Sequence, residues 1–168
     1  MKRIAVVGIS GSGKSTFANK LGEKLSIPSI HLDKYFWTKD WTERYSRADF
    51  QKVAEDFAKA DTWIIDGNYR SSIDMRFERA DTIIFLDYPK YKCIWRSFIR
   101  GFNKSQPFDK TEGAKEKFSL YLLKYNLLYP TNEMRERVQK YINSKQVFVV
   151  KNDKEKWCLL DLITENHI

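Results

Sequence analysis

The stretch "RIAVVGISGSGKS" (Arg3–Ser15) decides the fold. Its first half is short, apolar and rich in β-branched residues, which is the pattern of a strand buried on both faces of a parallel sheet. Its second half, "GISGSGKS" (Gly8–Ser15), matches G-x-x-x-x-G-K-[ST] at every fixed position. The next residues, "STFANKLGEKL", place Phe17, Leu21 and Leu25 at helical spacing. The glycine-rich motif therefore lies between a predicted strand and a predicted helix, the context that it requires.

Each residue type in this motif has a physical role. Glycines let the backbone curl so that successive N–H groups point inward, and the helix N-terminus adds partial positive charge. Lys14 can reach the β- and γ-phosphates, the Ser15 hydroxyl can ligate Mg²⁺, and Thr16 can hydrogen-bond the α-phosphate. The motif predicts a cradle for a nucleoside triphosphate. Its residues are Gly8, Ser10, Gly11, Ser12, Gly13, Lys14, Ser15 and Thr16.

The composition is that of an ordinary globular protein. The chain has 168 residues, of which 42% are hydrophobic and 31% charged, so we expect one domain over residues 1–168. No apolar run approaches the roughly 18–20 residues that a membrane span needs, so no membrane association is expected. Cys93 and Cys158 are far apart and form no metal-type pair, which favours reduced thiols and a cytoplasmic location.

Further strands and helices follow the first pair. Five short apolar strands that alternate with helical stretches predict an α/β fold with a parallel sheet. The later strands are expected at Ile27–Leu32, Thr62–Asp66, Asp81–Tyr88 and Gln146–Val150. The helices are expected at Ser46–Ala60, at Lys90–Arg100, in two stretches separated at Pro130, and from Asp153 to Asn166.

An acid, Asp66, ends the predicted third strand in "WIIDGNYR" (Trp63–Arg70). Ligands of open α/β sheets bind beyond the carboxyl ends of the strands, so Asp66 is expected beside the cradle. It can hold Mg²⁺ through water, since this ion keeps several waters when bound to protein. Gly67 would let another group approach closely. The alternative is that Asp66 only caps the following turn.

Positive charge gathers around a pair of arginines. The net charge is +8, and the stretch Lys90–Lys117 holds eight Lys or Arg against three Asp or Glu. Arg96 and Arg100 are four positions apart on a predicted helix and can stabilise charge on a transferred phosphoryl group. The polar stretch Gly101–Lys117 then reads as a lid-like excursion that excludes water. A solvated basic face and a nucleic-acid-binding patch are the alternatives.

The segment "HLDKYFWTKDW" (His31–Trp41) sets an acid among rings. Asp33 is expected at the end of the second strand, where a carboxylate can orient an attacking hydroxyl or hold Mg²⁺ through water. His31 would lie on the same side of that strand, as a second polar contact or as a structural histidine. Trp37 is the ring favoured to line an acceptor pocket, although large rings also cover cores. The other rings are Tyr35, Phe36 and Trp41, and the candidates for an anionic acceptor are Arg44, Arg47 and Arg70.

Taken in order, Gly8–Ser15, "DGNYR" and "RSFIR" resemble the nucleoside monophosphate kinase group of P-loop proteins. More narrowly, "LDKYFWTKDW", "WIIDGNY" and "RADTIIFLDYP" resemble the DNA topology modulation or FlaR-like proteins and related adenylate-kinase-like proteins. The resemblance implies a three-layer P-loop NTPase fold with a five-stranded parallel sheet of order 2-3-1-4-5. It also implies an acceptor-side segment at about 31–60 and a lid-like segment at about 101–117. The chain departs from adenylate kinases at Tyr69, where they have proline, and offers lysines instead of an arginine-rich lid.

The sequence thus predicts a cytoplasmic kinase that passes the γ-phosphoryl group of ATP to a small-molecule acceptor, with Mg²⁺ as its metal. Lys14, Asp33, Arg96 and Arg100 are the predicted catalytic residues, and Ser15 and Asp66 are the predicted metal-holding residues. The predicted acceptor-binding residues are Asp33, Trp37, Asp66, Gly67 and Arg70. The alternative is a nucleic-acid-associated or nucleotide-sensing regulator that binds ATP with little catalysis.

Overall fold

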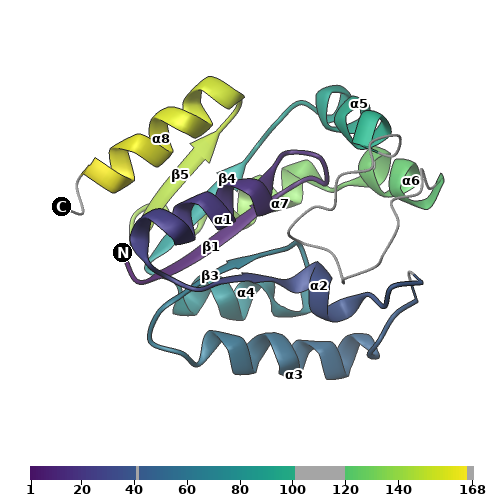
Figure 1. Ribbon diagram of the computed structural model, residues 1–168, viewed down its shortest axis with the longest axis horizontal. Coiled ribbons are helices and arrows are strands. Elements are labelled where there is room, and N and C mark those ends of the chain that lie inside the picture. Colours follow the sequence, from purple (N-terminus) through teal and green to yellow (C-terminus); the bar gives the residue numbers. More distant parts are fainter. Residues whose placement is uncertain (41, 101–119, 166–168) are drawn as a thin grey trace.

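A computed structural model describes residues 1–40, 42–100 and 120–165 of the chain. Its strands are β1 (Arg3–Gly8), β2 (Ser29–His31), β3 (Trp63–Asp66), β4 (Thr82–Leu86) and β5 (Gln146–Val150). They form one parallel sheet in the order β2-β3-β1-β4-β5, as the sequence predicts (Figure 1). Each parallel step requires a crossover, and the helices that provide these crossovers cover both faces of the sheet.

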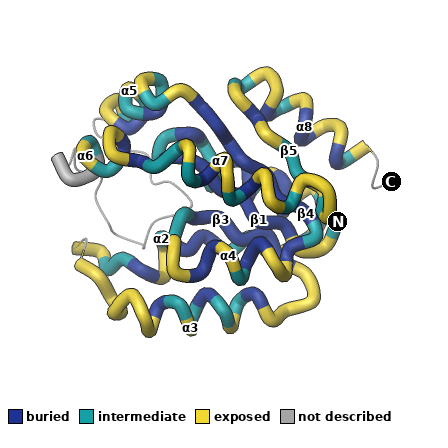
Figure 2. The backbone as a smooth tube through the Cα atoms, turned by 180° about the vertical axis from the view of Figure 1, so that it is seen from behind, coloured by how far each residue is buried: buried dark blue, intermediate teal, exposed yellow. Residues whose placement is uncertain are grey.

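The helices form the two outer layers. They are α1 (Lys14–Leu25), α2 (Leu32–Phe36), α3 (Arg47–Ala58), α4 (Arg70–Arg79), α5 (Lys90–Arg100), α6 (Leu120–Leu128), α7 (Thr131–Gln139) and α8 (Asp153–Glu165). Helices α1 and α8 pack together on the face turned toward the viewer in Figure 1. Figure 2 shows the opposite face, where α4 and α7 lie over the sheet and α3 packs beside α4. None of the described helices is long and apolar enough to cross a membrane.

The strand register aligns the carboxyl ends of the strands along one edge of the sheet. The central strand β1 is buried from Ile4 onward, because helices cover both of its faces (Figure 2). His31 pairs with Asp66, and Leu86 pairs with both Gly8 and Val150. Every segment that leaves this edge, including the glycine-rich loop, therefore starts close to its neighbours.

Two elements differ from the sequence-based expectation. The strand β2 ends at His31, and Asp33 lies in the short helix α2 rather than at a strand end. The cause is the pair Leu32 and Phe36, which are four residues apart and both buried, so one helical turn covers the core. The predicted excursion at Gly101–Lys117 lies outside the described residues.

Helix α4 has no counterpart among the predicted elements. Its buried face consists of Ile73 and Phe77 together with the polar side chains of Ser72 and Arg76. Three of its ten residues are apolar, Ile73, Met75 and Phe77, and their spacing of two does not give the hydrophobic repeat of a helix. The parallel pairing of neighbouring strands nevertheless demands a crossover at this point in the chain.

We predict that Gly22→Ala lowers stability although alanine is the better helix former. A Cβ atom at Gly22 would lie 2.2 Å from Ser29 Oγ and 2.7 Å from the carbonyl oxygen of Ile27, so α1 could no longer approach β2 as closely. The expected loss is about 1–3 kcal/mol of unfolding free energy, measured by urea denaturation. The exposed neighbour Glu23 supplies the control Glu23→Ala, which should change stability by about 0.5 kcal/mol or less. A Gly22→Ala protein as stable as the parent would contradict the close approach.

Candidate functional site

The glycine-rich loop between β1 and α1 has close neighbours in α5 and α8. Gly11 and Gly13 both have φ of 86°, a conformation in which side chains other than glycine are strained. A Cβ at Gly11 would lie 2.3 Å from the carbonyl oxygen of Cys93 in α5. A Cβ at Gly13 would lie 3.0 Å from the ammonium of Lys156 in α8. The positive φ favours glycine at both positions, and the backbone of α5 leaves no room for a Cβ at Gly11.

The inner side of the loop carries polar groups suited to an anion. Ser12 is fully buried, and within the described residues its hydroxyl has no hydrogen-bond partner. The Lys14 ammonium donates to the carbonyl oxygen of Ile9 at 3.1 Å, and so folds back across the loop. Ser10 is partly buried and Thr16 is exposed in the first turn of α1. These groups fit the phosphate cradle that the motif predicts.

A carboxylate stands beside the cradle, as expected. The Ser15 hydroxyl donates to Asp66 Oδ2 at 2.7 Å. The second oxygen, Oδ1, is 2.7 Å from His31 Nδ1, whose N–H donates to it. Both His31 and Asp66 are buried. His31 therefore contacts Asp66, the acid of the neighbouring strand, because the strand register places the two residues side by side.

A fully buried arginine lies beneath this carboxylate. Arg76 donates to the carbonyl oxygen of Gly67 at 3.0 Å and to that of Ser72 at 3.4 Å. Burial lowers the pKa of Arg76 to about 10, an effect that the nearby Asp66 and Tyr69 oppose. The guanidinium remains protonated at neutral pH and supplies Asp66 with a positive neighbour.

The segment after Asp66 joins the cradle to Asp33 through two consecutive side chains. The Asn68 side-chain oxygen accepts from the Gly8 N–H at 3.1 Å, while its amide donates to the Gly8 carbonyl oxygen. The next residue, Tyr69, donates its hydroxyl to Asp33 Oδ1 at 2.6 Å. Burial and the Asp33 carboxylate both raise the pKa of Tyr69, so the phenol stays protonated and fixes the carboxylate. Asp33 is thus linked to the segment after Asp66 through Tyr69 rather than through a strand end.

The rings near Asp33 divide between core and surface. Phe36 is buried and packs against Phe50 and Tyr69, with ring centroids 4.8 and 5.0 Å away. Trp37 is partly buried and meets Phe36 edge-on at 4.9 Å. Tyr35 is exposed and packs on a ring of α3. Trp41 lies outside the described residues. Phe36 belongs to the core, and Trp37 lies at its margin.

Arg96, the first of the two predicted arginines, binds an acid of the last helix. Arg96 binds Asp153 through both of its terminal nitrogens, and its Nη1 lies 3.2 Å from Oδ1. Lys92 and Lys156 each approach the same carboxylate to 3.1 Å. Burial of Asp153 opposes its ionisation, but hydrogen bonds from the three cations outweigh burial and lower its pKa. Arg100 lies one turn further along α5, at the end of that helix.

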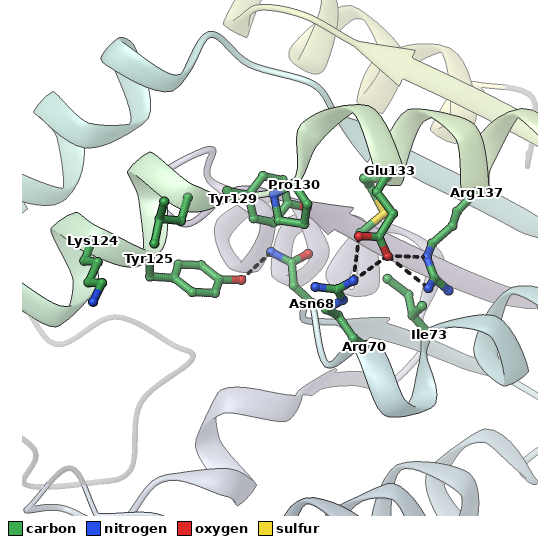
Figure 3. A pocket seen from close by; sticks show the side chains of 11 residues that line it. Asn68, Arg70, Ile73, Lys124, Tyr125, Tyr129, Pro130, Glu133 and Arg137 are labelled. Atoms are coloured by element: carbon green, nitrogen blue, oxygen red, sulfur yellow. Dashed lines mark hydrogen bonds and ion pairs between the residues drawn. The ribbon is translucent and has the colours of Figure 1, made fainter.

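Arg70 lines a separate cavity of about 310 Å³ between α4, α6 and α7 (Figure 3). Its guanidinium binds both carboxylate oxygens of Glu133, and Arg137 binds the same carboxylate from the other side. Asn68 reaches the cavity from the cradle side, and its amide donates to the Tyr125 hydroxyl at 3.4 Å (Figure 3). The cavity is therefore joined to Gly8 through a single side chain. Arg44 and Arg47, the other predicted anion-binding arginines, are exposed.

Sequence reasoning missed several residues that build this site. Asn68 and Tyr69 lie within the quoted "WIIDGNYR". Their amide and hydroxyl groups, so close to Asp66, could have marked them as residues that bind neighbouring parts of the site. Arg76 lies in the helix that the apolar pattern failed to mark. Asp153 and Lys156 begin the last helix, where a charged first turn resembles any solvated helix start.

Comparisons with known proteins agree with the fold. No protein-family model matches the chain. The uncharacterized protein YqaC of Bacillus subtilis (strain 168) is 26% identical over 137 residues, which cover 81% of this chain and 77% of that protein. Shikimate kinase from Acinetobacter baumannii in complex with shikimate superposes with a TM-score of 0.64 at 16% identity, covering 99% of this chain and 92% of the other. A gluconokinase from Sinorhizobium meliloti 1021 gives a TM-score of 0.56 at 18% identity, with coverage of 98% and 94%. The chain therefore has the fold of P-loop small-molecule kinases.

We predict that Asp153→Asn lowers stability by about 1–2 kcal/mol at neutral pH, since three cations lose their shared counterion. The lowered pKa of Asp153 means that its contribution is complete above the unfolded carboxyl value of about 3.9 and is lost as pH falls below it. Urea denaturation of both proteins from pH 7 to pH 2 should show the difference shrinking below about pH 4. Asp161→Asn, an exposed site on the same helix, is the control. A pH-independent difference would contradict the ionic origin.

Proposed function

We propose that this chain is a P-loop kinase that binds MgATP and transfers the γ-phosphoryl group to a hydroxyl of a small-molecule acceptor. The observation that carries the proposal is the 2.7 Å hydrogen bond from Ser15 to Asp66, at the mouth of a loop that also holds Lys14. A hydroxyl and a carboxylate in contact beside a phosphate cradle are the oxygen ligands that a nucleotide-bound Mg²⁺ requires. The fold of small-molecule kinases supports the same conclusion.

The cradle residues bind the nucleotide. Inward N–H groups of the loop and the Lys14 ammonium hold the β- and γ-phosphates in place. Ser15 and Asp66 are the residues that would hold Mg²⁺, which supplies positive charge against the phosphate oxygens when it is bound. Arg76 limits the negative charge around Asp66, and His31 fixes the orientation of the carboxylate.

Asp33 orients the acceptor in this proposal. The acceptor oxygen forms a bond to the γ-phosphorus, the bond from that phosphorus to the β-phosphate oxygen breaks, and ADP leaves with the electron pair. The hydroxyl proton passes to the Asp33 carboxylate and from there to solvent. Tyr69 keeps this carboxylate aligned through Oδ1. The hydrogen bonds of Asn68 to Gly8 hold Tyr69 in a fixed place relative to the cradle.

The acceptor lies between Asp33 and the cavity lined by Arg70. Gly67 has φ of 134° and a Cβ there would lie 3.0 Å from Leu32, so the backbone turns tightly at this point. In this proposal Trp37 offers an apolar face, and Arg70 offers a charge when it exchanges the Glu133 carboxylate for the acceptor. A flat or anionic small molecule, with a nucleoside or nucleotide among the candidates, suits these groups.

Charge on the transferred group is stabilised by Lys14 and by Arg96 and Arg100 of α5. Arg96 can reach a phosphate only by exchanging the carboxylate of Asp153 for it. Such an exchange replaces one charge-assisted contact with another, so its energetic cost is small. The proposal also includes a cytoplasmic location and one domain over residues 1–168, and free Cys93 and Cys158 support the reducing compartment.

We predict that Lys14→Ala reduces phosphoryl transfer by about 100-fold or more, because a charge aimed at the phosphates is lost. Transfer from labelled ATP would be screened over nucleosides, nucleotides and small hydroxyl metabolites. With the acceptor found, Asp33→Asn should lower kcat and leave the affinity for ATP unchanged. Lys24→Ala, an exposed site in α1, is the matched control. Full ATP affinity and turnover in Lys14→Ala would refute the proposal.

A second candidate function is association with DNA, as the name of the DNA topology modulation subgroup implies. The observation that favours it is the net charge of +8. Contacts to phosphate groups of DNA release counterions, so the affinity for duplex DNA should fall steeply as salt rises. A gel-shift series from 50 to about 200 mM salt measures this slope. Binding that vanishes at physiological salt would reduce the effect to non-specific charge attraction.

A further inference from the structure

Lys156 is a buried lysine for which the motifs provide no role. It lies in the first turn of α8 and only 5% of its surface is exposed. Its ammonium lies 4.6 Å from the centre of the Trp157 ring and 5.7 Å from that of Tyr88. Burial lowers its pKa, an effect that the nearby Asp153 opposes. A charge removed from water in this way needs compensation from its surroundings.

The surroundings compensate this charge only in part. An ammonium has three N–H donors, and among the described residues the one side-chain oxygen that accepts from Lys156 is Asp153 Oδ1, at 3.1 Å. The same oxygen accepts from the Tyr88 hydroxyl and from Arg96, both at 3.2 Å. Because Asp153 also serves Lys92, one negative charge faces three positive charges in the part of the chain that the structure describes. The cluster retains positive charge in a partly desolvated place.

This excess charge lies against the cradle. The Lys156 ammonium is 3.0 Å from the position that a Cβ of Gly13 would occupy. From the other side, Cys93 of α5 contacts Gly11, so the helix that carries Lys92 and Arg96 also touches the loop. The cluster therefore borders the loop at the two glycines whose N–H groups help to form the cradle. A bound anion would be the natural partner for these donors.

We propose that Lys156 is a second phosphate-binding lysine of the site, whose ammonium stabilises the polyphosphate of the nucleotide held by the Gly8–Ser15 cradle. The inference rests on the proposed nucleotide binding and assigns a phosphate-binding role to a residue outside the motif. Asp153 then holds the cations together when the anion is absent. The ligand chemistry is that of a polyphosphate, so the base and the sugar are not required for this contact.

The experiment measures binding of ATP and of inorganic tripolyphosphate by isothermal titration calorimetry. Lys156→Met should weaken both by about 10-fold or more, the size of a charge-assisted hydrogen bond. Lys156→Arg, which keeps the charge, should recover most of the affinity. Lys154→Met, at an exposed position two residues earlier in α8, should leave it unchanged. Folding of each variant is checked by circular dichroism and urea denaturation.

The outcomes separate this inference from the proposed function. If Lys14→Ala weakens ATP binding and a folded Lys156→Met does not, the inference fails and the cradle stands. If neither substitution weakens ATP binding, the proposed function itself fails. Should Lys156→Met not fold, the wild-type protein decides, because tripolyphosphate should shift the NMR resonance of the Lys156 ε-methylene and leave that of Lys154 in place. An unshifted Lys156 resonance at saturation would overturn the inference.

Discussion

The rest of the site depends on one steric constraint, the absence of side chains at Gly11 and Gly13. A carbonyl oxygen of α5 lies 2.3 Å from the position of a Cβ at Gly11, and an ammonium of α8 lies 3.0 Å from the corresponding position at Gly13. The glycines let the loop curl its N–H groups inward while these two helices approach it closely. The cations of α5 and α8 therefore border the loop. The glycines define the electrostatics of the site as much as its shape.

The acidic side of the site is held by a second set of contacts. The segment from Asp66 to Arg70 touches the Ser15 hydroxyl, the Gly8 backbone, the Asp33 carboxylate and the cavity beside α7 in turn. Five consecutive residues thus connect the glycine-rich loop to Asp33 and to the cavity. Arg76 beneath this segment binds the Gly67 carbonyl and balances the charge of Asp66. In the proposed kinase, this segment would keep nucleotide and acceptor at a fixed separation, which is the main requirement of phosphoryl transfer.

Among the described residues, three cations of α5 and α8 share a single acid, Asp153. Asp153 binds Lys92, Arg96 and Lys156, although one carboxylate neutralises only one of them. Apolar side chains in place of these charged groups would lose less hydration free energy on burial. The cluster therefore adds little to the free energy of unfolding beyond holding α5 against α8. A site for a polyanion explains the excess, because its charge would complete the compensation that Asp153 begins. Asp153 would hold Arg96 only until a polyanion binds. The contact between them therefore leaves Arg96 available for the proposed chemistry.

The sequence by itself determined the glycine-rich loop, the parallel sheet and Asp66 at the end of β3. These features follow from glycine spacing and apolar runs, which are local properties of the chain. It also predicted the sheet order, through resemblance. The tertiary structure decided that Asp33 lies in a helix, that Tyr69 fixes it from 36 positions away, and that Arg96 binds an acid 57 positions away. It also placed Lys156 beside Gly13. No local pattern encodes such partners, because they meet only when crossovers bring the carboxyl ends of parallel strands to one edge.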